Sequence, residues 1–285
     1  MAAPRNKALP ARFAQVWAKT ATWDGRWVIE AFCFVNLAFL AFDIYIAHST
    51  NHFQRVEEWI PFYFSLAGPL LLALGFVLLH KWKVQAPWRD LGHLVGWAAI
   101  AIGCAGVIFH LDSRFFYERT LKSLTYAAPF AAPLAYTGLG MLLIMNRMVQ
   151  PGSLEWSKWV LLLALGGFLG NFVLSLTDHA SNGFFRTSEW IPVISSAFAV
   201  AFLLVAILMK IGRRFLWLCA AVLVLQAGVG VLGFVLHVVA NLAGPSTRPL
   251  ENLVNGAPPL APLLFPNLAL LGLIGLWTMS RRVSE

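Results

Sequence analysis

Residues 48–61 read HSTNHFQRVEEWIP, and residues 179–192 repeat this stretch as HASNGFFRTSEWIP. Eight of the 14 aligned positions are identical, where about one match is expected by chance. The identical pairs are His48/His179, Asn51/Asn182, Phe53/Phe184, Arg55/Arg186, Glu58/Glu189, Trp59/Trp190, Ile60/Ile191 and Pro61/Pro192. Four of these eight pairs are polar (His, Asn, Arg and Glu) and lie between apolar stretches, so their repetition predicts a site and not only a duplicated hydrophobic helix.

Two further stretches recur at similar offsets. The spacing Gly103-x-x-Gly106-x-x-x-His110 returns as Gly230-x-x-Gly233-x-x-x-His237. Residues 119–134, RTLKSLTYAAPFAAPL, match residues 248–263, RPLENLVNGAPPLAPL, at eight of 16 positions. The chain is therefore predicted to contain two four-helix repeats, 28–148 and 159–280.

The composition is that of a membrane protein. Hydrophobic residues make up 59% of the chain and charged residues 12%, whereas soluble domains carry about 25% charged residues. Stretches long enough to cross about 30 Å of hydrocarbon occur at 28–47, 60–80, 92–111, 126–146, 159–177, 190–209, 215–239 and 258–279. We predict an all-α integral membrane protein with eight transmembrane helices, and the lipid bilayer is its first partner.

The positions of Lys and Arg predict the orientation. One set of connecting segments and termini holds 15 basic residues and the opposite set holds six, which favours cytoplasmic termini in a bacterial inner membrane. On this topology 1–27 is a cytoplasmic basic interfacial segment, 149–158 a cytoplasmic linker and 281–285 a cytoplasmic tail. An even number of spans per repeat makes the repeats parallel, related by a pseudo-twofold axis along the membrane normal. The net charge of +8 reflects mostly this bias, so no nucleic-acid partner is predicted.

Four repeat-matched histidines are predicted at the outer, non-cytoplasmic ends of their helices: His48, His110, His179 and His237. Imidazole is a ligand for transition metals and for haem iron, so these residues predict a metal ion or haem. His52, Asp43 and Asp178 lie close in sequence and are further candidate ligands. The alternative is that each histidine only caps a helix C-terminus.

The residues around these histidines also allow two interpretations each. The faces formed by Gly103 and Gly106, and by Gly230 and Gly233, could admit a flat cofactor ring or serve close helix packing. Glu58 and Glu189 are carboxylate partners of the histidines or helix caps. Four arginines hold an anion such as haem propionate, or tie loops together through ion pairs: Arg55, Arg186, Arg119 and Arg248.

Our leading hypothesis is one asymmetric metal or haem site on the pseudo-twofold axis, with His110 and His237 reaching it from opposite repeats. It would serve redox chemistry or metal handling. One alternative is a transporter or channel for a small solute, which parallel repeats favour. The other is a non-catalytic subunit whose outer loops dock other membrane or periplasmic proteins.

Overall fold

The computed structural model describes residues 25–283, which form an all-helical bundle without strands in this range. The predicted interfacial segment 1–27 lies almost wholly outside these residues. The first predicted repeat, 28–148, corresponds to four long helices: α2 (Gly25–Ser49), α3 (Trp59–Trp82), α4 (Gln85–Asp112) and α7 (Leu134–Met148). The second predicted repeat, 159–280, corresponds to four more: α8 (Leu154–Ser181), α9 (Trp190–Leu208), α10 (Arg213–Leu242) and α12 (Leu264–Val283). We call these two groups of helices the first half and the second half.

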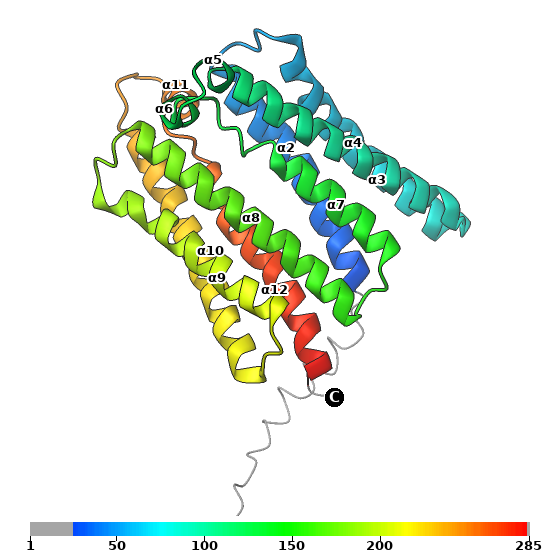
Figure 1. The fold of residues 1–285 in the computed structure, drawn as a ribbon. Coiled ribbons are helices and arrows are strands. Elements are labelled where there is room, and N and C mark those ends of the chain that lie inside the picture. Colours follow the sequence, from blue (N-terminus) through cyan, green and yellow to red (C-terminus); the bar gives the residue numbers. More distant parts are fainter. Residues whose placement is uncertain (1–24, 284–285) are drawn as a thin grey trace, which may run out of the picture.

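In both halves, short helices precede the second and the fourth long helix. The 3-10 helices η1 (Val56–Glu58) and η2 (Thr187–Glu189) lead into α3 and α9. Before α7 the chain forms α5 (Phe115–Glu118) and α6 (Leu121–Thr125), and before α12 it forms α11 (Pro249–Asn255) and η3 (Ala261–Leu263). Figure 1 shows α5, α6 and α11 together at one end of the bundle and the C-terminus at the opposite end. The first is called the histidine end and the second, which holds residues 149–153, the linker end.

The structure confirms a helical membrane protein, and it leaves the eighth predicted span unconfirmed. Within the described residues seven helices are long and apolar enough to cross a membrane. The exception is α7, whose 15 residues extend only about 22 Å. The predicted span 126–146 is shortened because Pro129 and Pro133 keep its first eight residues out of the helix, and Pro133 stands at the N-cap of α7.

Each half is a ring of four helices. In the first half α2 and α4 both pack against α3 and α7, so α2 and α4 stand diagonally opposite each other. In the second half α8 and α10 both pack against α9 and α12 and stand diagonally as well. This arrangement decides which histidines can meet. His48 and His110 lie in the last turns of α2 and α4. His179 and His237 lie near the ends of α8 and α10.

The halves share one continuous apolar core, and α7 lies against α8 between them. A polar cluster joins them at the linker end. Asn146 donates to Oε1 of Glu30 at 2.8 Å, and its Oδ1 accepts from the indole of the fully buried Trp156 on α8 at 3.1 Å. Arg147, whose side chain is only 1% exposed, pairs with Glu30 at 2.8 Å. Nearer the middle, Asn267 on α12 donates to Asn36 on α2.

Candidate functional site

The structure brings the four histidines together as two pairs, one in each half. The ring centroids of His48 and His110 are 6.3 Å apart, and those of His179 and His237 are 6.5 Å apart. The planes of the two rings are steeply inclined in both pairs, at 72° and 82°. His110 therefore meets His48 across the diagonal of its own half. This arrangement differs from the predicted single site in which His110 and His237 face each other, and it has a simple cause: each half closes its own four-helix ring.

The second imidazole of each pair is oriented by a backbone carbonyl. Nδ1 of His110 lies 2.9 Å from the carbonyl oxygen of Pro129, and Nδ1 of His237 lies 2.8 Å from that of Pro258. A carbonyl oxygen can only accept, so both contacts require a proton on Nδ1. Nε2 is then the unprotonated nitrogen, free to bind a metal, and this carbonyl–histidine arrangement is typical of metal-ligating histidines.

We call Gly103 and Gly106 on α4, with Gly230 and Gly233 on α10, the glycine stripe. It explains how the carbonyl groups of Pro129 and Pro258 reach the imidazoles. A Cβ placed on Gly103 would lie 2.8 Å from the carbonyl oxygen of Pro133, and one on Gly106 would lie 2.7 Å from the Pro133 ring. In the second half, a Cβ on Gly230 would lie 2.6 Å from the carbonyl oxygen of Pro262. Only glycine permits such an approach of the proline segment to α4 and α10.

Gly233 makes the same approach, since its Cβ would lie 2.9 Å from Cβ of Pro262. All four glycines thus face protein, so the predicted groove for a flat ring is filled by the proline segment. The close-packing interpretation is the one that the structure supports. The repeated GxxGxxxH spacing serves to seat a proline-rich segment whose carbonyl orients the histidine.

The first imidazole of each pair faces a carboxylate. Nδ1 of His48 lies 3.6 Å from Oε2 of Glu58, and Nδ1 of His179 lies 3.7 Å from Oε2 of Glu189. These distances are too long for a hydrogen bond but short enough for electrostatic attraction to favour a proton on Nδ1. Neither glutamate side chain makes a capping hydrogen bond to its helix, which favours the interpretation as histidine partners over that as helix caps.

The two carboxylates also leave an acceptor atom unused. Oε2 of Glu58 and Oε2 of Glu189 are both buried and have no hydrogen-bond partner. A buried acceptor without a donor is costly, and a nearby protonated imidazole or cation would offset that cost. In the first half Asn51 holds the other oxygen of Glu58 at 2.8 Å. Asn182, its counterpart, instead contacts the carbonyl oxygen of Asp178 at 3.4 Å.

An aromatic pair closes the loop beside each site. Phe53 and Phe184 both adopt left-handed backbone conformations, with φ of 50° and 51°. Their rings stack on Trp59 at 4.1 Å and on Trp190 at 3.9 Å. The left-handed geometry is unfavourable for a bulky residue, so the stacking and the helix-end hydrogen bonds must hold it in place. These contacts explain why Phe and Trp were conserved between the two repeats of this chain.

His52 does not join the site. The helix ends at Ser49, so His52 lies in the following loop and not one helical turn beyond His48. It is exposed and has φ of 59°, and the matching position in the second half is Gly183 with φ of 74°. This position requires a left-handed backbone in both loops, which explains why the repeats differ here.

The two aspartates lie inside the helices. Asp43 and Asp178 are half-buried in α2 and α8, five residues and one residue before the histidines. Asp43 lies close enough to Tyr136 on α7 for an electrostatic interaction. Within residues 25–283 neither carboxylate forms a hydrogen bond or ion pair with an imidazole, so their role as ligands stays a prediction.

The arginines have local partners at the surface. Arg55 lies 3.9 Å from Asp112 and thereby ties the first loop to the end of α4, and Arg248 pairs with Glu251 at 2.9 Å. Arg186 lies over the ring of Phe185 at 5.7 Å, and Arg119 is exposed at the end of α5. These contacts favour loop ties, and anion binding by the arginines stays a prediction.

The size of each site suits an ion. A metal lies about 3.2 Å from the centroid of an imidazole that ligates it, so two ligands of one ion span at most about 6.4 Å. The separation of 6.3 Å in the first half lies just inside this limit and that of 6.5 Å in the second half just beyond it, so a shared ion would need the two imidazoles on nearly opposite sides. Within residues 25–283 no group of three or more His, Cys, Asp or Glu side chains is arranged as a metal site. Each site therefore offers two nitrogen ligands.

Comparisons of the chain with protein-family models, with curated proteins and with solved structures found no match.

Proposed function

We propose that this membrane protein binds transition-metal ions at two quasi-equivalent sites, His48/His110 and His179/His237, one in each half. The observation that carries the proposal is the engagement of Nδ1 in all four imidazoles. Two of them face a carbonyl oxygen and two face a carboxylate, which leaves four Nε2 atoms as free ligands. Helix capping alone gives no reason for this arrangement to occur in both halves.

An ion fits the residues better than haem does. A haem needs a slot beside its axial histidines, and the glycine faces that were candidates for that slot are filled by the proline segments. An ion needs only the nitrogen atoms and their orienting partners. Glu58 and Glu189 would support the positive charge from the second coordination shell.

The coordination number favours metal handling over a permanent structural role. Structural zinc sites have four protein ligands, whereas two imidazoles leave positions open for water or an incoming ligand. The side chains of His48 and His179 are 21% and 20% exposed, so an ion can exchange with the medium. We infer that the protein receives and releases a metal such as copper or zinc, for which imidazole is a suitable ligand.

Absorbance and metal analysis of the purified protein test this proposal. After removal of metal with a chelator and reloading with Zn²⁺ or Cu⁺, we expect tight uptake and no Soret band. His80→Ala and His93→Ala, at the linker end, are matched controls and should leave uptake unchanged. A stoichiometric Soret band, or no uptake of any divalent or monovalent transition metal, would contradict the proposal.

A further inference from the structure

A groove lies between α8 and α9 at the linker end, far from the histidines. Its volume is about 390 Å³, and it is lined by Leu154, Glu155, Lys158, Trp159, Leu162 and Ile207. Three of its apolar side chains are well exposed: Leu154 at 47%, Trp159 at 37% and Leu162 at 41%. Both helices are long and apolar enough to span a membrane, so a groove on their outer side would face lipid.

The two halves differ at this position. The offset of 131 residues aligns Lys158 with Trp27 and Ile207 with Phe76. In the first half Trp27 packs edge-on against Phe76 with ring centroids 5.6 Å apart, and it also contacts His80 at 5.1 Å. The space between α2 and α3 is thus filled by aromatic rings, whereas the second half has smaller or flexible side chains and an open groove.

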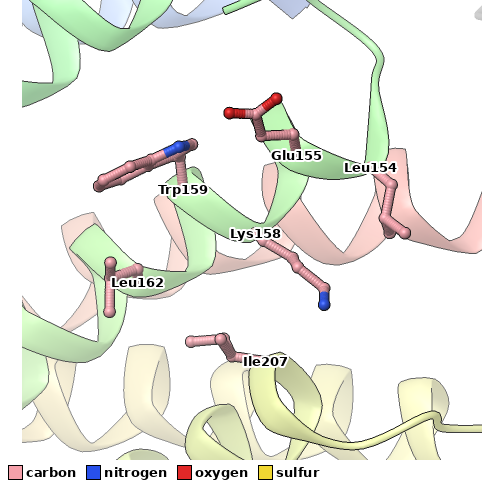
Figure 2. Close-up of a pocket in the computed structure, with 6 residues that line it drawn as sticks. All are labelled: Leu154, Glu155, Lys158, Trp159, Leu162 and Ile207. Atoms are coloured by element: carbon pink, nitrogen blue, oxygen red, sulfur yellow. The ribbon is translucent and has the colours of Figure 1, made fainter.

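Basic side chains lie at the linker end of the groove, where the headgroup of a bound lipid would lie. Figure 2 shows the Lys158 side chain reaching toward α9 on the side of Ile207, whereas the Glu155 carboxylate points away from α9. The loop after α9 adds Lys210, and the first turn of α10 adds Arg213 and Arg214 at the same end of the bundle. Basic residues close to the end of a membrane-spanning helix attract anionic lipids, each by about fivefold in affinity.

We propose that the groove binds one anionic phospholipid, with an acyl chain along Leu162 and Ile207 and the phosphate at Lys158. The chain takes the place that Trp27 and Phe76 fill in the first half. This inference does not depend on the proposed metal sites.

Native mass spectrometry of the detergent-purified protein tests it, with phosphatidylglycerol and phosphatidylcholine of identical chains as probes. We expect one tightly held phosphatidylglycerol. The double variant Lys158→Trp/Ile207→Phe copies the first half and should lose that lipid. Lys158→Gln keeps the groove and should lower the preference for phosphatidylglycerol by about fivefold.

Leu204→Phe is the matched control, because Leu204 is exposed on the same helix outside the groove and its replacement should leave lipid binding unchanged. Circular dichroism confirms that each variant is folded. The proposal is overturned if the folded double variant retains the lipid, or if Lys158→Gln leaves the lipid preference unchanged. It is also overturned if the groove variants change a dimer equilibrium instead of lipid binding.

Discussion

Replacing Gly230 by Ala should separate the packing role of the glycine stripe from the helix preference of the residue. A Cβ at Gly230 would lie 2.3 Å from Cδ of Pro266 and 2.6 Å from the carbonyl oxygen of Pro262, so the proline segment must move. Overpacking of this kind costs about 1–3 kcal/mol. Gly228, two residues earlier on the same helix, has no atom within 4 Å of its Cβ position. Gly228→Ala should therefore stabilise α10 by about 0.5–1 kcal/mol.

The difference between the two variants isolates the steric cost, because both gain the same helix preference. We expect Gly230→Ala to be less stable than Gly228→Ala by about 1–3 kcal/mol, or roughly 2–12 °C in thermal midpoint in detergent. The moved segment also carries Pro258 away from Nδ1 of His237, so metal content should fall in Gly230→Ala and not in Gly228→Ala. Equal midpoints for the two variants would refute the role assigned to the stripe.

Three further outcomes are expected. Glu30→Gln removes the carboxylate from Arg147, which is 1% exposed, and should lower the free energy of unfolding by about 3–5 kcal/mol in denaturant titrations; a loss below about 1 kcal/mol would argue against a buried ion pair. His52→Gly should raise stability by about 1 kcal/mol and leave metal content unchanged, because φ of 59° suits glycine, as Gly183 shows; loss of metal would make His52 a ligand. A cysteine placed at Leu121, which is 84% exposed, should react with an impermeant thiol reagent from outside intact cells, and labelling only after lysis would reverse the topology.

The sequence was sufficient for the all-helical membrane class, and it singled out four histidines that the structure places in two pairs. Apolar length predicts the long helices without knowledge of packing, and α7 is the one that is much shorter than its predicted span, because prolines precede it. The repeat also pointed to Glu58 and Glu189, which the structure places 3.6 and 3.7 Å from the imidazoles of His48 and His179. It could not say which histidines meet, because that depends on which helices stand diagonally in each four-helix ring.

Two other features could not be predicted from the sequence. The carbonyl groups of Pro129 and Pro258 orient imidazoles, yet a backbone atom leaves no residue-type signal except the repeated proline itself. The buried cluster of Glu30, Arg147 and Trp156 joins residues more than 100 positions apart across the two halves, so neither periodicity nor the repeat indicates it.

The most direct test of the two-site account is the number of metal ions per chain, measured by elemental mass spectrometry after reloading and removal of free metal. We predict two ions for the natural chain and one for His48→Ala/His110→Ala. The matched variant His179→Ala/His237→Ala should also retain one ion, and the fourfold variant none. A single ion that is lost on changing either pair would indicate one shared site, and metal content unaffected by the fourfold change would contradict the account altogether.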